Sequence, residues 1–191
     1  NAASLEVANR TGGIAIGADL TAGTDLTLTA NGGGVATGAI TSSGGTLAAT
    51  GGNMTLDAAE GIGDIGAGNP VSIGAVGGVL SATNTDSGDL YLSTGAVTLG
   101  GGNPALSQYA GGALRIDSSG NIIIAGDVST GAAGTIILNA TGTITEAAPG
   151  AGTLTAGTVE LGTSGTTTAI GTAAAPVLTA STTLLDARGS T

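Results

Sequence analysis

The sequence predicts an all-β protein folded as a parallel β-helix, a solenoid of short strands. Two observations carry the prediction. Aliphatic residues recur in pairs separated by one residue, with glycine, asparagine or aspartate in the gaps between pairs. The chain of 191 residues contains 38 glycines, and about a quarter of it is threonine or serine, yet it has neither phenylalanine nor tryptophan. A β-helix explains both observations, because its narrow core can be filled by aliphatic side chains without aromatic rings.

Each short strand is expected where two aliphatic residues flank a third, since alternate strand residues point to the same face. In chain order these pairs are Ile14/Ile16, Leu26/Leu28, Met54/Leu56, Val71/Ile73, Leu90/Leu92, Val97/Leu99, Leu114/Ile116, Ile122/Ile124, Ile136/Leu138 and Val159/Leu161. Single aliphatic anchors lie between them at Val35, Ile40, Leu47, Val128, Ile144 and Leu154. Helices are disfavoured because glycine interrupts most windows of three helical turns.

The strands are expected to stack in coils because similar phrases repeat along the chain. "TDLTLTANGG" (24–33), "GNMTLDAAEGI" (52–62), "GDLYLSTGAV" (88–97), "GNIIIAGDV" (120–128) and "GTIILNATGTI" (134–144) share one pattern of turn residue, aliphatic, variable and aliphatic. Three strands per coil of about 20 residues give roughly nine coils. We expect one domain over residues 1–191. The alternative, an antiparallel sandwich, usually fills its thicker core with aromatic residues.

Composition excludes several classes of function. Thirteen acidic residues against three arginines give a net charge of −10, which disfavours nucleic acid and anionic membranes as partners. No run of apolar residues reaches the length of a membrane-spanning helix, so membrane insertion is not expected. The absence of cysteine excludes disulfides and thiol chemistry, and the absence of histidine also leaves no usual zinc ligands.

Acidic residues are dense in two places, "LDAAEGIGD" with Asp57, Glu60 and Asp64, and "NTDSGD" with Asp86 and Asp89. Some β-helical enzymes that cut acidic polysaccharides use clustered acids, so such an enzyme is one alternative. Acid–base catalysis of this kind usually also enlists lysine, arginine or histidine, which are missing nearby. The same acidic residues could bind calcium, but the ligand order of known calcium-binding loops is absent, so the indication is weak. We therefore expect no enzyme and assign no catalytic, cofactor-binding or metal-binding residue.

Threonine offers another alternative. The T-x-T triplets at Thr27/Thr29, Thr141/Thr143/Thr145, Thr153/Thr155 and Thr166/Thr168 are typical of an ice-binding face on a β-helix, although they cluster in the last third of the chain. Sugar binding is less strongly indicated, since Tyr91 and Tyr109 are isolated and are expected to be packing residues at corners. The glycine clusters "NGGG" (31–34) and "LGGGN" (99–103) lack the lysine of a phosphate-binding loop and indicate corners instead.

With these repeats in view, the stretch "GNIIIAGDVSTGAAGTIILNATGTITEA" and the one beginning "GTLTAGTVELGTSG" resemble the repeat region of filamentous haemagglutinin-like exoproteins. The resemblance covers most of the chain. It implies a right-handed β-helical shaft, exported to the bacterial surface, with a role in adhesion, aggregation, biofilm building or display. It therefore implies a secreted structural protein.

The ends of the chain suggest how such a shaft would be assembled. Solenoids require polar caps, because an open coil exposes backbone groups and core side chains. Neither "NAASLEVANR" nor "TLLDARGST" is typical of a capping helix. We therefore expect each end to abut more β-helix, either because the chain is a segment of a longer shaft or because copies stack end to end. The expected partners are a second copy of the chain and a host or neighbouring cell surface.

Overall fold

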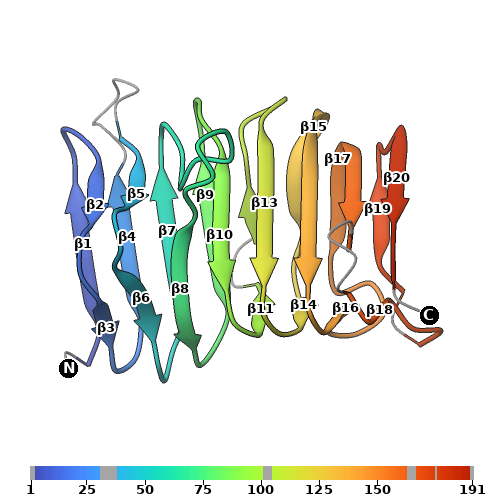
Figure 1. Ribbon diagram of the computed structural model, residues 1–191, viewed down its shortest axis with the longest axis horizontal. Helices are drawn as coiled ribbons and strands as arrows, with labels where there is room; N and C mark the ends of the chain where they lie inside the picture. Colours follow the sequence, from blue (N-terminus) through green and yellow to red (C-terminus); the bar gives the residue numbers. More distant parts are fainter. Residues whose placement is uncertain (1–2, 31–37, 101–104, 163–166, 175, 190–191) are drawn as a thin grey trace.

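A computed structural model describes residues 3–30, 38–100, 105–162, 167–174 and 176–189. It shows a parallel β-solenoid of about 7 turns, which confirms the predicted fold class. The described residues contain strands and turns but no helix, and thus no helix able to span a membrane. Strands of successive coils stand side by side along the long axis, from β1 near the N-terminus to β20 near the C-terminus (Figure 1).

The strands are short and separated by turns. Their bounds are β1 (Leu5–Asn9), β2 (Ile14–Ile16), β3 (Leu20–Ala22), β4 (Leu26–Ala30), β5 (Ile40–Ser42), β6 (Thr46–Ala49), β7 (Met54–Ala58), β8 (Val71–Val76), β9 (Leu80–Asn84), β10 (Leu90–Thr94), β11 (Val97–Leu99), β12 (Leu106–Ser107), β13 (Ala113–Ser118), β14 (Ile122–Ile124), β15 (Val128–Ala140), β16 (Thr143–Glu146), β17 (Thr153–Leu161), β18 (Ala169–Ile170), β19 (Leu178–Ala180) and β20 (Leu184–Ala187).

Parallel pairing arranges these strands in three columns, which form the faces of the solenoid. The first face contains β1, β4, β7, β9, β12, the start of β15, the start of β17, and β19. The second face contains β2, β5, the start of β8, β10, β13, the ends of β15 and β17, and β20, joined through bridges at Ile62. The third face contains β3, β6, the end of β8, β11, β14, β16 and β18.

All ten predicted aliphatic pairs lie in strands, and five of the single anchors do as well. Val35 lies outside the described residues. Sequence reasoning missed β1, β3, β9, β12 and β18 to β20. In β3 and β9 alanine fills one of the two inward positions, as at Leu20/Ala22 and Leu80/Ala82, so a pattern of large aliphatic pairs does not include them.

The predicted number of coils, roughly nine, is too high. Residues in register on neighbouring coils are 21 to 28 positions apart, so each coil is longer than the expected 20 residues. The additional residues of each coil lie in the connections at the corners. One coil also carries a loop from Asp64 to Asn69, closed by two backbone hydrogen bonds of 2.9 Å, which separates Ile62 from Val71 on the second face.

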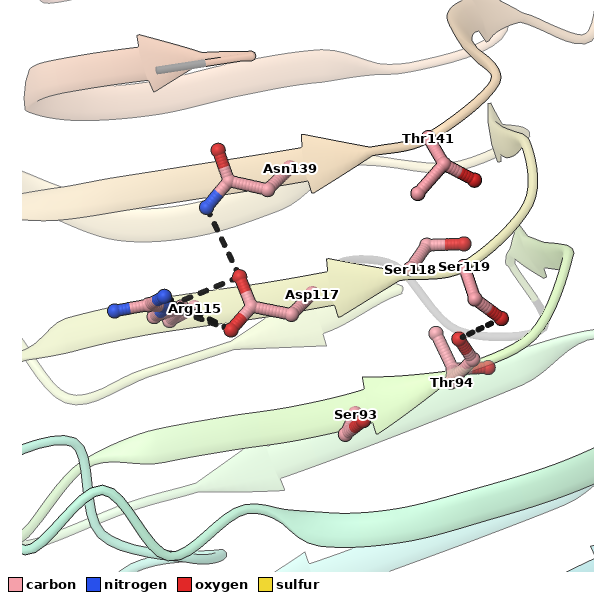
Figure 2. Close-up of a pocket in the computed structure, with 8 residues that line it drawn as sticks. All are labelled: Ser93, Thr94, Arg115, Asp117, Ser118, Ser119, Asn139 and Thr141. Atoms are coloured by element: carbon pink, nitrogen blue, oxygen red, sulfur yellow. Dashed lines mark hydrogen bonds and ion pairs between the residues drawn. The ribbon is translucent and has the colours of Figure 1, made fainter. Parts of the chain in front are cut away.

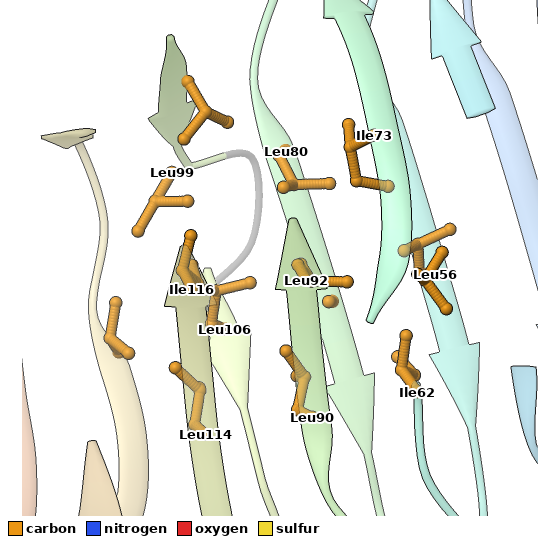
Figure 3. Close-up of a cluster of buried hydrophobic side chains, with 14 of the residues drawn as sticks. Leu56, Ile62, Ile73, Leu80, Leu90, Leu92, Leu99, Leu106, Leu114 and Ile116 are labelled. Atoms are coloured by element: carbon orange, nitrogen blue, oxygen red, sulfur yellow. The ribbon is translucent and has the colours of Figure 1, made fainter. Parts of the chain in front are cut away.

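The core is a stack of aliphatic side chains that runs along the solenoid axis. Inward and outward residues alternate along the strands, as in β4, where Leu26 and Leu28 are fully buried. Similar residues meet from coil to coil, so that Leu92 pairs with Ile116, and Ile116 with Leu138. Side chains from facing strands fill the interior between them (Figure 3). Each coil therefore depends on its neighbours to bury its apolar side.

A recurring arrangement of glycine over asparagine or aspartate holds successive coils in register. The side-chain oxygens of Asp19, Asp25, Asn53, Asn121 and Asp127 accept hydrogen bonds of 2.8 to 3.0 Å from backbone N–H groups of the next coil. In each case the donor follows a glycine. A Cβ at Gly52, Gly78 or Gly142 would collide with the accepting oxygen, so glycine is needed for this approach. The turn residues of the repeat therefore act between coils.

This arrangement makes a stability prediction at Asn121, whose Oδ1 accepts the Thr143 N–H at 2.9 Å. Asn121→Ala should lower the free energy of unfolding by about 1 kcal/mol, the usual net value of one hydrogen bond. Asn121→Asp keeps an accepting oxygen and should lose less than half of that. Urea unfolding monitored by circular dichroism measures both. Equal losses in the two variants would show that the hydrogen bond is not what Asn121 contributes.

Candidate functional site

The outer side of the second face carries a polar cluster of four residues from three successive coils, here called the Asp117 cluster. It consists of Tyr91 on β10, Arg115 and Asp117 on β13, and Asn139 on β15. Register brings them together, because Tyr91 pairs with Arg115, and Asp117 pairs with Asn139. Outward positions of a parallel stack lie about 4.8 Å apart from coil to coil, within reach of side-chain contacts.

Asp117 is the centre of this cluster. Its carboxylate accepts hydrogen bonds from the Tyr91 hydroxyl at 2.7 Å, from Asn139 Nδ2 at 2.9 Å and from Arg115 Nε at 3.0 and 3.1 Å. A terminal guanidinium nitrogen of Arg115 also forms an ion pair with Asp117 at 2.9 Å. The guanidinium lies over the Tyr91 ring, 5.1 Å from its centroid, which adds a cation–π contact. The Arg115, Asp117 and Asn139 contacts are visible in Figure 2.

These contacts determine the protonation states of the cluster. Burial by itself would raise the pKa of the Asp117 carboxyl, but hydrogen bonds from Arg115, Asn139 and Tyr91 outweigh it and hold that pKa below its usual value. Burial raises the pKa of the Tyr91 hydroxyl, and the bond to Asp117 raises it further. The hydrogen bond to Asp117 raises the pKa of Arg115. Asp117 is therefore a poor general acid at neutral pH.

The lowered pKa of Asp117 makes a prediction about pH. A carboxyl whose pKa is lower in the folded state than in the unfolded chain stabilises the fold above the unfolded value of about 3.9, and this contribution disappears as pH falls through the folded value. Wild-type protein should therefore lose stability below about pH 4. Asp117→Asn should lose less stability over that range. Urea midpoints at several pH values compare the two, and parallel pH dependences would contradict the assignment.

A shallow groove of about 380 Å³ lies over this cluster on the side of the solenoid. It is lined by Ser93, Thr94, Arg115, Asp117, Ser118, Ser119, Asn139 and Thr141. Asn139 and Thr94 are only 6% and 5% exposed, whereas the Arg115 side chain is 34% exposed. The groove thus has a buried polar floor and an accessible guanidinium at one side. Its volume is at the small end of the range for ligand sites.

The outer side of the first face is different, because it presents hydroxyl groups in register. One column runs through Thr29, Asp57, Thr83, Ser107, Ser129 and Thr155, and a second through Thr27, Thr55 and Ser81. All of them are half-buried except Thr55, which is exposed. We call these two columns the hydroxyl face. Complete T-x-T triplets are few here, but serine and single threonine residues occupy the positions between them.

The other predicted triplets do not join this face. Thr143 and Thr145 lie on β16 of the third face. Thr166 lies outside the described residues, and so do the "NGGG" segment and most of "LGGGN". Tyr91 lies within strand β10 rather than at a corner, and it is only 9% exposed under Arg115. Tyr109 is half-buried in a turn, as expected of a packing residue.

The two acidic stretches of the sequence meet at one corner of neighbouring coils. The backbone N–H of Asp86 donates to the Ala59 carbonyl at 3.0 Å, and that of Ile62 donates to the Asp89 carbonyl at 2.7 Å. Two of the side chains serve the backbone, since Asp64 accepts from Ala67 N–H of its own turn at 2.9 Å, and Asp89 accepts from Ile65 N–H of the neighbouring coil at 3.2 Å. Among the described residues, no group of three or more acidic side chains is arranged to hold a metal ion.

Sequence reasoning missed the Asp117 cluster and one buried acid. The stretch "LRID" (114–117) places Arg115 and Asp117 on one side of a strand, which the alternation could have revealed. Tyr91 and Asn139 lie on the neighbouring coils, so assigning them to the cluster requires the number of residues in each coil, which the sequence pattern does not give. Glu146 is 4% exposed and occupies an inward position above Ile124, where its carboxylate accepts from Gly150 N–H at 2.7 Å and Leu178 N–H at 2.9 Å. Glu146 therefore ties the final coils together.

Comparison of the chain with protein-family models, with curated proteins and with solved structures gives no match. The candidate functions therefore depend on the solenoid and its faces.

Proposed function

We propose that this protein is a structural module of an extracellular or cell-surface fibre, in which the solenoid acts as a rigid spacer and presents its sides for adhesion. The observation that supports the proposal is the uninterrupted aliphatic core, which extends through all described coils. Because every coil packs on the next, length is gained by adding coils along one axis. The resemblance of the repeats to haemagglutinin-like exoproteins agrees with a shaft that is secreted by bacteria.

The last coil supports an axial partner. Leu178, Leu184 and Leu185 are 40%, 55% and 53% exposed, which is unusual for aliphatic residues in this chain. Leu185 borders an open hollow of about 470 Å³ that is also lined by Leu161, Ile170 and Val177. The first coil likewise leaves Leu5, Val7 and Leu20 only half-buried.

We propose that more β-helix covers the last coil, either further coils of a longer shaft or the first coil of a second copy, since both ends present parallel strand edges and aliphatic inward residues. Such a contact would satisfy the unpaired backbone groups of both edges and bury the exposed leucines. Between two copies such a contact would be heterologous, head to tail, so it would generate a filament rather than a closed dimer.

Electron microscopy and sedimentation of purified protein at several concentrations test the proposal. Wild-type protein should form filaments with an axial spacing of about 4.8 Å. Leu184→Glu/Leu185→Glu should leave short rods, because charge would be buried at the joint. Thr98→Glu on the third face is the matched control and should leave filaments intact. Isolated rods of wild-type protein at every concentration would reject end-to-end assembly.

The hydroxyl face favours a second candidate function, ice binding. Its columns place hydroxyl groups in register from coil to coil, with Asp57 interrupting the first column and Glu6 as the other acidic residue of the face. The hydroxyls of Thr29, Thr83 and Thr155 make no hydrogen bond within the described residues, so they are available to ordered water. Thermal hysteresis that is present in wild-type protein and lost in Thr83→Tyr, but kept in Thr145→Tyr, would establish it. A wild-type protein without hysteresis would reject it.

The remaining alternative, a polysaccharide-active enzyme, gains no such support. Asp64 and Asp89 at its predicted site accept hydrogen bonds from the backbone, and hydrogen bonds from Arg115, Asn139 and Tyr91 hold the pKa of Asp117 below its usual value. We therefore do not propose it.

A further inference from the structure

We propose that the groove over the Asp117 cluster binds a neutral saccharide. This inference goes beyond the role of the rod as a spacer, because it assigns a ligand class to one place on its side. The groove is built from three coils, with Ser93, Asp117 and Asn139 in register on β10, β13 and β15. It therefore presents polar groups over a distance of two coil spacings along the axis.

The polar groups of the groove are preorganised. Asp117 is held by three side chains, and Arg115 is fixed between the carboxylate and the Tyr91 ring. A rigid polar group loses little conformational entropy when it binds. Asp117 engages Nε and one terminal nitrogen of Arg115, so other N–H donors of the planar guanidinium stay available beside the groove. Arg115 can thus donate to a ligand without breaking its ion pair.

Hydroxyl groups gather around the groove. Ser119 and Thr141 are exposed at its rim. Thr94 also lines it, but it shares the inward register of Leu90 and Leu92 on β10, so its buried hydroxyl belongs to the core side of the strand. Hydroxyl groups that both donate and accept are the natural complement of sugar hydroxyls.

The charges around the groove select against anions. Arg115 and Asp117 neutralise one another, Glu160 lies next along the column beyond Ile137, and the whole chain carries a net charge of −10. An anionic ligand would therefore be repelled. The Tyr91 ring is covered by Arg115, so recognition would depend on hydrogen bonds and not on stacking of a sugar on an aromatic ring. Together these features favour a neutral, hydroxyl-rich ligand.

Titration with defined oligosaccharides tests the proposal. The probes are cellopentaose, maltopentaose and chitopentaose, with a galacturonate pentamer as the acidic comparison, and binding is followed by saturation-transfer NMR and calorimetry. At least one neutral probe should bind, and more tightly than the acidic one. Ser119→Ala/Thr141→Ala should raise Kd by at least about fivefold, equivalent to one lost hydrogen bond. Thr145→Ala, on the third face, is the matched control and should bind like wild type.

A second variant tests whether a loss of binding is caused by misfolding. Arg115→Gln/Asp117→Asn removes both charges together and should abolish binding while the circular dichroism spectrum stays that of the folded rod. Failure of all neutral probes to bind, preference for the acidic probe, or equal binding by the groove variants would overturn the proposal. Sedimentation reports end-to-end assembly separately, so either idea can fail while the other stands.

Discussion

Gly88→Ala should lower the free energy of unfolding by about 3 kcal/mol or more, the largest effect we expect of a Gly→Ala change at the described glycines. Gly88 has a φ of 76°, a left-handed conformation that disfavours any side chain. A Cβ there would also collide with the backbone carbonyl of Glu60 on the preceding coil. Because the obstacle is backbone, relief requires separating the coils.

Two other glycines serve as matched controls and separate these two causes. Gly68 has a φ of 69°, but a Cβ added there would meet only open space, so Gly68→Ala should lose only the conformational part, about 1 to 2 kcal/mol. Gly95 has neither a positive φ nor a close neighbour, so Gly95→Ala should change stability by less than about 1 kcal/mol. Urea unfolding of the three variants gives the comparison. Similar losses for Gly88→Ala and Gly68→Ala would show that close packing of coils is not limiting at Gly88.

Ile116→Ala should be comparably damaging, with a loss of about 3 to 4 kcal/mol. Ile116 is fully buried between Leu92 below and Leu138 above, so truncation leaves a cavity inside the column. In a solenoid the effect should spread to the coils on both sides, because each buries its apolar face on the next. Amide hydrogen exchange should therefore quicken in β10 and β15 as well as in β13.

Ile123→Ala is the control for this experiment. Ile123 is also in a strand, but it points outward on the third face and is half-buried between Thr98 and Thr145. Its truncation should cost less than about 1 kcal/mol. If Ile123→Ala were as destabilising as Ile116→Ala, the inward and outward assignment of these strands would be wrong.

The fold class could be predicted because its signals are local. A pair such as Leu114/Ile116 shows which side of a strand is buried, and the surrounding glycines disfavour a helix. Both signals are read from neighbouring residues and do not depend on the rest of the chain. The aliphatic core without aromatic rings follows from composition. Dependence on local pairs also explains the strands that were missed, since Leu20/Ala22 and Leu80/Ala82 carry only one large side chain each.

The lateral sites could not be predicted in the same way, because they depend on how many residues each coil contains. Tyr91, Arg115 and Asn139 meet only because the coils between them are 24 and 22 residues long, and the hydroxyl face needs the register of six coils. A shift of one residue would turn an outward side chain inward. Alternation and glycine content alone therefore determined that this chain is a solenoid, whereas hydrogen bonds between coils decided which outward side chains became neighbours.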